Sequence, residues 1–275
     1  FVSRAVFSPD ATQLLVDASG EAFDGIGLKI KEGQTSNTSD GQLFLYNITD
    51  KSIKPLTKDF DPSVDSYEWN ALDKQIYIMA KDKDRVRMYS LNPSNGKIKQ
   101  LQAKEDVISD YSIANQAFEM VYFGLSASNS QRLYTYNLKN DASSCLIDLS
   151  KEILRDVTLG EVQDWNFVSA QGDTIYGRFY LPPHFDATKK YPMIVNYYGG
   201  TTPTARVMES RYPSHVYAGL GYIVYIIQPS GATGFGQEFS ARHVNAWGKL
   251  TADEIIEGTK KFCEEHPFVN TEKSD

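Results

Sequence analysis

The longest apolar runs of the sequence lie in its last third, and they show little polar alternation. They cover residues 193–198 and 222–227. Glycines 199 and 200 end the first run, and a glycine-rich turn at residues 230–236 ends the second. Unbroken apolar runs of strand length are typical of parallel strands that are covered on both faces. The pattern therefore predicts the start of an α/β sheet, whose functional groups gather at the carboxyl ends of its strands.

Helical periodicity follows these runs. The apolar face of one predicted helix consists of Ile255, Ile256, Thr259, Phe262 and Cys263. Thr251 is a suitable N-cap, Asp253 and Glu254 suit the first turn, and Pro267 ends the helix. A short helix is expected at residues 214–220 and a charged helical crossing at residues 149–160. Alternating segments around residues 171–173 predict a hairpin at the antiparallel edge of the sheet.

Residues 1–150 alternate short strands with turns, and the same order of strands recurs. Tyr46, Tyr89 and Tyr136 occupy corresponding positions at spacings of 43 and 47 residues. A period of about 40–50 residues with several strands in each unit is typical of β-propeller blades. We therefore expect about three four-stranded blades, fewer than the four or more that close a ring. The alternative is a meander or sandwich in which this spacing is accidental.

Composition narrows the classes of protein. The chain has 275 residues, 41% hydrophobic and 23% charged, which is ordinary for one or two globular domains. A net charge of −7 argues against nucleic acid as a partner, and no apolar run approaches the length of a membrane span. Cys145 and Cys263 fall in different predicted domains, and we expect two free buried thiols. Because the sequence starts with Phe1 and shows no signal-peptide pattern, we expect it to begin inside a longer protein.

Four motifs in the last third carry a resemblance to a known family. They are Leu181-Pro182-Pro183-His184-Phe185-Asp186, Lys189-Lys190-Tyr191-Pro192, Tyr198-Gly199-Gly200 and Gly231-Ala232-Thr233-Gly234-Phe235-Gly236. Together they resemble the prolyl oligopeptidase family of serine peptidases, and most closely its dipeptidyl peptidase IV branch. The resemblance is close over residues 162–275 and looser before them.

The resemblance implies an architecture and an activity. Residues 1–155 would form a partial β-propeller, and residues 156–275 the first part of an α/β-hydrolase domain. The parent protein would be a serine peptidase that releases X-Pro or X-Ala dipeptides from peptide substrates, without a cofactor or metal. A homodimeric parent and a periplasmic, secreted or cytoplasmic location all stay open. The alternatives are an esterase of the same fold class and a catalytically inactive interaction protein.

The resemblance also assigns site residues. In the family, a tyrosine directly before the glycine pair donates its hydroxyl to the oxyanion, and Tyr198 matches that position. The alternative role for Tyr198 is to cap the sheet with a locally bonded hydroxyl, and Tyr197 is expected to face the core. The glycines that would let backbone approach the substrate are Gly199, Gly200, Gly231, Gly234 and Gly236.

The nucleophile, the acid and the base are not found. No G-x-S-x-G motif occurs, and in this fold the order is serine, acid, histidine, so all three would follow Asp275. The four histidines, His184, His215, His243 and His266, are therefore interpreted as surface or packing residues. Glu264-Glu265 does not correspond to the acidic pair that grips a substrate amino terminus, because the family's pair belongs to the propeller. The chain alone is expected to be inactive.

Overall fold

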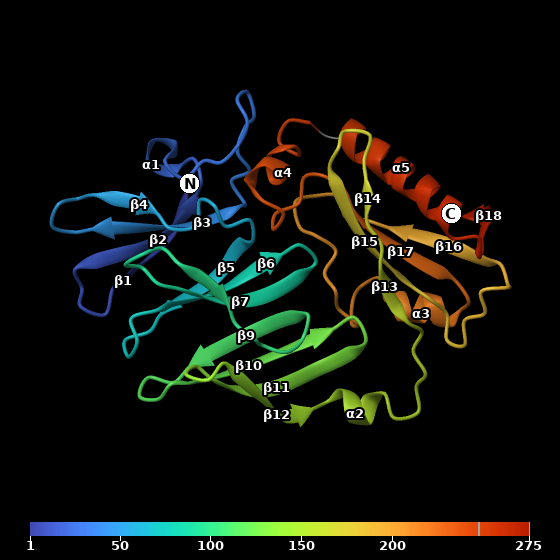
Figure 1. Ribbon diagram of the computed structural model, residues 1–275, viewed down its shortest axis with the longest axis horizontal. Helices are drawn as coiled ribbons and strands as arrows, with labels where there is room; N and C mark the ends of the chain where they lie inside the picture. The colour runs from blue at the N-terminus through green and yellow to red at the C-terminus, as the bar shows by residue number, and fades with distance from the viewer. Residues whose placement is uncertain (247, 275) are drawn as a thin grey trace.

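The computed structural model describes residues 1–246 and 248–274, and its architecture is dominated by β-sheet (Figure 1). Two sheets from the first half of the chain, antiparallel except for one strand pair, lie beside a mixed sheet from the second half. The described residues also contain five helices, of which only the last is long. No helix among these residues combines the length and apolar character that a membrane crossing requires.

The first sheet is a four-stranded antiparallel meander. Its strands are β1 (Val2–Phe7), β2 (Gln13–Ser19), β3 (Gly41–Asn47) and β4 (Ile53–Pro55), in that order. The long connection between β2 and β3 contains the short α1 (Ala22–Gly25).

The second sheet joins two further groups of four strands. One group is β5 (Ser63–Trp69), β6 (Ile76–Asp82), β7 (Arg85–Leu91) and β8 (Ile98–Gln100); the other is β9 (Val107–Ile113), β10 (Glu119–Ser126), β11 (Asn129–Asn137) and β12 (Ala142–Asp148). Neighbouring strands within each group are antiparallel. The groups meet through a single parallel pairing of Val86 with Val107. The sheet is therefore two repeated units whose edges touch.

The tyrosine spacing reflects this repeat. Tyr46, Tyr89 and Tyr136 lie in β3, β7 and β11, the third strand of each group. The predicted correspondence of the three positions is confirmed. The groups also pack face to face, because one core contains Leu43 with Ile78 and the next contains Tyr77 with Met120. The middle group is thus covered on both faces, as alternating inward and outward side chains allow.

The third group has an apolar row on its outer face. Phe123 pairs with Leu133 across β10 and β11, and Leu133 pairs with Ile147 of β12. Phe123 and Ile147 are exposed, and together with Leu149 the row borders a surface hollow of about 320 Å³. An apolar row across three strands promotes association between molecules.

We expect residues 1–275 to self-associate through this row. Ile147→Lys should place a charge there and shift the molecule towards the monomer, measured by sedimentation velocity at several concentrations. Asn140→Lys adds the same charge in the exposed turn between β11 and β12 and is the control. Equal association of the two variants would contradict the assignment.

The third sheet is mixed and carries most of the helices. Its strands are β13 (Val162–Asp164), β14 (Phe167–Val168), β15 (Thr174–Tyr180), β16 (Tyr191–Asn196), β17 (Ile223–Gln228) and β18 (Val269–Ser274). The order is β13-β15-β17-β16-β18, with β14 paired to β15. β16 runs parallel to both β17 and β18, whereas β15 is antiparallel to β17. The two apolar runs are thus adjacent parallel strands, and the predicted antiparallel hairpin strand lies beside them.

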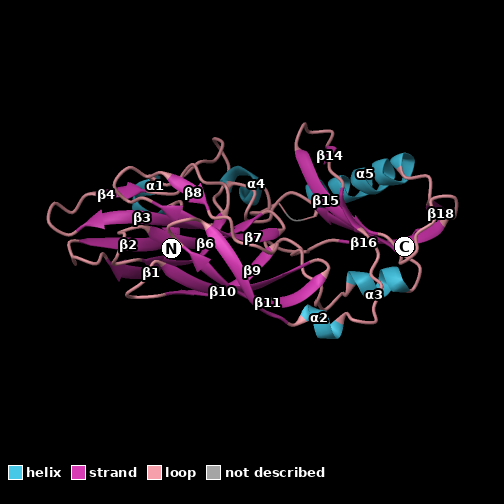
Figure 2. Cartoon of the chain, turned by 60° about the horizontal axis from the view of Figure 1, so that its bottom comes forward, coloured by secondary structure: helices cyan, strands magenta, loops and turns pink. Residues whose placement is uncertain are grey.

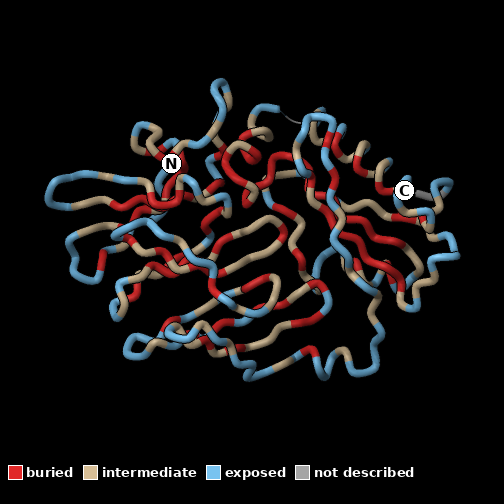
Figure 3. Tube along the Cα trace, viewed as in Figure 1, coloured by how far each residue is buried: buried red, intermediate tan, exposed pale blue. Residues whose placement is uncertain are grey.

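Helices cover both faces of this sheet (Figure 2). Tyr225 and Ile227 of β17 pack with Phe262 of α5 (Lys249–Glu265), which lies on one face. Val224 and Ile226 point the other way and pack with Ala218 of α3 (Ser214–Gly219). All six residues of β17 are buried, and the interior of the sheet is correspondingly red in Figure 3. The covered central strand explains the unbroken apolar run.

Several predicted details are wrong. The expected helix at residues 149–160 is only one turn, α2 (Ser150–Ile153). α5 begins at Lys249, so Glu254 lies in its second turn rather than its first. Tyr197 is 51% exposed rather than turned into the core, because the strand ends before it. Both cysteines are free, but Cys145 is exposed on the edge strand β12.

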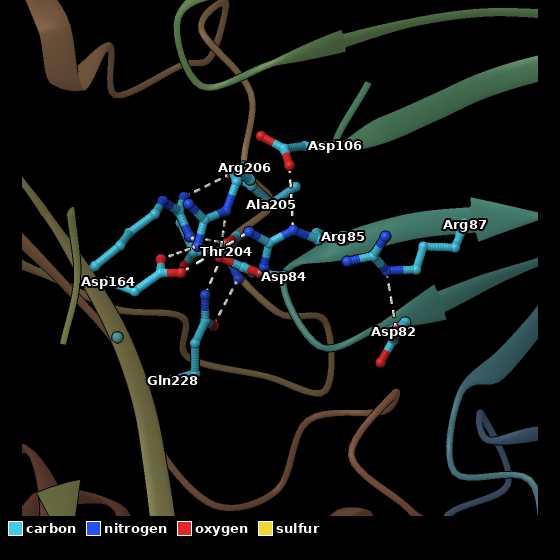
Figure 4. Close-up of polar contacts among 12 residues, drawn as sticks. Asp82, Asp84, Arg85, Arg87, Asp106, Asp164, Thr204, Ala205, Arg206 and Gln228 are labelled. Atoms are coloured by element: carbon cyan, nitrogen blue, oxygen red, sulfur yellow. Dashed lines mark hydrogen bonds and ion pairs between the residues drawn. The ribbon is translucent and has the colours of Figure 1, made fainter. Parts of the chain in front are cut away.

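A cluster of ionic side chains joins the two halves of the chain (Figure 4). Asp84 lies in the turn between β6 and β7, and its Oδ2 accepts hydrogen bonds from Arg178 (2.9 Å) and Arg206 (3.1 Å). Its Oδ1 accepts a third, from Arg85 (3.1 Å). We call Asp84 with these three arginines and Asp164, which pairs with Arg206, the Asp84 cluster.

The centre of the Asp84 cluster, formed by Asp84, Arg178 and Arg206, is almost closed to water, whereas Asp164 lies at its exposed edge. The side chain of Arg178 on β15 is 1% exposed, and those of Arg206 and Asp84 are 9% and 10% exposed. Arg178 also donates to the carbonyl oxygens of Thr204 (3.0 Å) and Ala205 (2.7 Å). Charges buried to this degree are tolerated because they are paired and hydrogen-bonded. The turn of the first half thereby holds the segment that follows Gly199 and Gly200.

Candidate active site

Tyr198 lies just beyond the carboxyl end of β16, next to the end of the parallel strand β17. Its hydroxyl donates a hydrogen bond to the carbonyl oxygen of Pro229, which directly follows β17. The backbone amide of Ala232 donates to the same hydroxyl. The phenol is therefore held between the ends of two adjacent strands, the position at which α/β sheets place their functional groups.

Burial raises the pKa of Tyr198 well above its ordinary value. The amide of Ala232 acts in the opposite direction, and the negative charge of Glu254 adds to the rise. The hydroxyl consequently keeps its proton at physiological pH. A neutral phenol fixed in a desolvated position can donate to a negative charge that develops nearby.

Gly199 and Gly200 border an open pocket beside Tyr198. A Cβ atom at either glycine would have no neighbouring atom within 4 Å. The pocket has a volume of about 410 Å³ and is mostly apolar. Its other walls include His243 and, from α5, Ala252 and Ile255. Its size falls within the range of small-ligand sites.

The remaining predicted glycines lie in a buried turn that packs against other parts of the chain. Gly231, Gly234 and Gly236 all have positive φ, which favours glycine. A Cβ at Gly231 would lie 2.7 Å from Cβ of His243. At Gly234 it would lie 2.8 Å from the carbonyl oxygen of Lys81, and at Gly236 it would lie 3.0 Å from Asp61. Gly234 and Gly236 therefore provide close contact with the first half of the chain.

Backbone hydrogen bonds reinforce this contact. The amide of Lys83 donates to the carbonyl oxygen of Gly234 (2.9 Å), and the amide of Gly236 donates to that of Asp61 (3.0 Å). The turn after β17 thus faces the first half of the chain on one side and Tyr198 on the other. The sequence pattern gave the glycines but not the surface against which they pack.

Glu254 and Arg242 converge on Ser230, and sequence reasoning missed both. Glu254 accepts hydrogen bonds from the amide and the hydroxyl of Ser230, each at 2.7 Å. Arg242 donates to the same hydroxyl (3.3 Å) and forms two hydrogen bonds with Asp173 (2.6 and 3.0 Å). The apolar periodicity of α5 marks only its packing face, so it gave no signal for a buried carboxylate.

Neither His215 nor His266 forms a catalytic relay with a carboxylate in the contacts described. Nε2 of His215 lies 3.1 Å from the hydroxyl of Ser128, but no carboxylate of the described residues is bonded to its buried Nδ1. Burial lowers the pKa of His215. A serine–histidine relay needs an acid at Nδ1 to orient the ring. Nδ1 of His266 donates a hydrogen bond to the carbonyl oxygen of Phe262 (2.8 Å), and His243 lines the pocket beside Tyr198.

Comparison with known proteins shows which family and which proteins the chain is similar to. Residues 209–274 match the model of the prolyl oligopeptidase family. "Probable dipeptidyl-peptidase 5" of Aspergillus terreus is 28% identical over 97% of the chain, and dipeptidyl-peptidase 5 of Porphyromonas gingivalis is 25% identical over 97%. These matches confirm that the motifs resemble those of the prolyl oligopeptidase family.

The structural comparison agrees on the fold. The acylaminoacyl peptidase of Pyrococcus horikoshii superposes on 97% of the chain with a TM-score of 0.75, at 18% sequence identity. The chain spans 36% and 37% of the lengths of the two curated relatives and 39% of the length of that structure. The shared fold extends over nearly all of the chain, including the antiparallel groups before β13.

Proposed function

We propose that the full-length gene product is a serine peptidase that releases dipeptides from the amino termini of short peptides. The observation that carries the proposal is the half-buried, protonated hydroxyl of Tyr198 at the ends of two parallel strands, beside an open pocket. The names of the curated relatives supply the substrate class. Chemistry on peptides also suits the family whose model matches residues 209–274.

In this proposal Tyr198 stabilises the transition state of acyl transfer. Attack of a serine on the peptide carbonyl places negative charge on the carbonyl oxygen, and a preorganised donor lowers the energy of that state. A phenol has one proton, so the hydroxyl that donates to Pro229 in the free protein turns to the oxyanion. Gly199 and Gly200 leave room for the substrate backbone, because their Cα atoms face open space.

The proposal includes a division of the chain. Residues 1–155 form three blades of a β-propeller and residues 156–275 the first part of the catalytic domain, within which Asp275 lies outside the described residues. Support comes from the three repeated antiparallel groups and from the change to a mixed sheet at β13. Gly231, Gly234 and Gly236 then serve the substrate site indirectly, by seating the turn beside Tyr198.

Two other functions are separated from this one by simple observations. An esterase of the same fold class would hydrolyse p-nitrophenyl esters but not dipeptidyl nitroanilides. A catalytically inactive interaction protein would do neither. The repeated antiparallel groups and the position of Tyr198 favour the peptidase.

A serine-directed probe tests the proposal directly. The full-length gene product should react stoichiometrically with a fluorophosphonate and hydrolyse X-Pro or X-Ala nitroanilides. Purified residues 1–275 should do neither, because the nucleophile is expected outside them. Labelling is read by mass spectrometry of the intact protein.

The Ser128–His215 pair provides the control for this experiment. If residues 1–275 were labelled, Ser128→Ala would show whether this hydrogen-bonded serine is responsible. Stoichiometric labelling of residues 1–275 would contradict the placement of the nucleophile. A full-length protein that is neither labelled nor active would overturn the peptidase proposal.

A further inference from the structure

Glu254 is a buried carboxylate to which the proposed chemistry assigns no role. It lies on α5 and is 2% exposed. Burial raises the pKa of its carboxyl above the ordinary value. A carboxylate in such a place destabilises the fold unless its oxygens are hydrogen-bonded. Its partners therefore indicate what it does.

Both oxygens of Glu254 bind the same residue. Oε2 accepts the backbone amide of Ser230 and Oε1 accepts its hydroxyl, each at 2.7 Å. Hydrogen bonds to a charged acceptor are short and strong, and two of them restrain both position and orientation. Ser230 is itself 2% exposed, so water does not compete for these contacts.

Ser230 lies in the loop that holds the Tyr198 hydroxyl. The residue before it, Pro229, supplies the carbonyl oxygen that accepts the hydrogen bond from the Tyr198 hydroxyl. Two residues after it, Ala232 supplies the amide that donates to the hydroxyl oxygen. Glu254 thus fixes the loop between the two groups that contact the phenol.

We propose that Glu254 is a positioning residue for the Tyr198 hydroxyl. By holding residues 229–232 against α5, it sets where the phenol proton lies before the oxyanion forms. This inference rests on the proposed function and states that Glu254 acts on Tyr198 through Ser230. Arg242 donates a hydrogen bond to the hydroxyl of the same serine and is itself hydrogen-bonded to Asp173.

Kinetics of the full-length gene product test the role. Glu254→Ala should lower kcat about tenfold or more and leave KM within about twofold, because the oxyanion contact strengthens in the transition state. Asp253→Ala is the matched control: its side chain is 56% exposed and pairs with Lys249 on the outer face of α5. Unchanged kcat in the folded Glu254→Ala variant would overturn the proposal.

A double-mutant cycle separates positioning from mere support of the fold. In the Tyr198→Phe background, Glu254→Ala should cost less than about twofold in kcat, because the hydroxyl that it positions is gone. Glu254→Gln, which can still accept the Ser230 amide, should restore part of the loss. Equal losses in both backgrounds would overturn the role. If Glu254→Ala does not fold, Ser230→Ala, which removes one of the two contacts, replaces it in the cycle.

A spectroscopic measurement keeps this test independent of activity. With 3-fluorotyrosine incorporated, the ¹⁹F resonance of Tyr198 is identified by its absence in Tyr198→Phe. It should shift in Glu254→Ala and stay in place in Asp253→Ala. An unshifted resonance would overturn the positioning role, even in an active enzyme. A shifted resonance in a protein without peptidase activity would support the positioning role and refute the proposed function.

Discussion

Asp84→Ala is expected to lower the free energy of unfolding by about 3–5 kcal/mol, the typical effect of removing one partner from a buried ion pair. The substitution leaves the guanidinium of Arg178, 1% exposed, without the carboxylate that it contacts. The guanidinium of Arg178 still donates to the carbonyl oxygens of Thr204 and Ala205, but these oxygens carry no full charge. Urea unfolding followed by circular dichroism measures the change, with the dependence of the unfolding free energy on urea concentration held equal for all variants.

Two comparisons isolate the buried charge as the cause. Asp59→Ala removes a carboxylate whose side chain is 84% exposed and whose ion pair with Lys29 is open to water, so it should cost less than about 1 kcal/mol. Combining Asp84→Ala with Arg178→Met removes the unpaired charge of Arg178. The double variant should therefore lose less free energy of unfolding than Asp84→Ala alone. A loss below about 1 kcal/mol for Asp84→Ala would contradict the assignment.

Tyr198→Phe is expected to lower kcat of the full-length gene product by roughly a hundred- to a thousand-fold, or about 3–4 kcal/mol in the transition state. KM should change little, because the ground-state carbonyl makes weaker use of the donor. The variant also leaves the carbonyl of Pro229 and the amide of Ala232 without this partner, so about 1–3 kcal/mol of stability should be lost as well. Steady-state kinetics and thermal melts on the same variant measure both effects.

The balance between the two effects decides the role of Tyr198. A tyrosine that only caps the sheet would lose stability and keep turnover within a few-fold of the unsubstituted enzyme. An oxyanion donor loses turnover far beyond what the change in melting temperature accounts for. Tyr217→Phe serves as a control, since Tyr217 belongs to α3 and packs against the face of the sheet opposite to α5.

Local periodicity predicted most of the secondary structure. Tyr46, Tyr89 and Tyr136 mark equivalent strands because each blade-like group repeats the same inward and outward alternation. The unbroken run of β17 follows from helices on both faces of its sheet. The site was predicted only as far as the family's motif extended, to Tyr198 and its glycines.

Long-range polar contacts left no local signal. Asp84 and Arg178 are 94 residues apart, and each is an ordinary charged residue in its own strand or turn. Glu254 occupies a helix position at which a glutamate is normally solvated, and only the fold brings it to Ser230. The prediction that Tyr197 faces the core was wrong for a related reason. The apolar run does not show where β16 ends, and the exposed Tyr197 lies beyond that end.

The Asp84 cluster makes the two halves of the chain poorly interchangeable. Arg178 belongs to the mixed sheet, yet its counter-charge comes from a turn of the antiparallel sheet. A different β-sheet module grafted before β13 would have to present a carboxylate at the same point, together with backbone that accepts the turn at Gly234. Mutations on either side of this boundary are therefore constrained by the other side. Divergence in such a protein is expected to proceed by paired changes across the boundary rather than by exchange of whole modules.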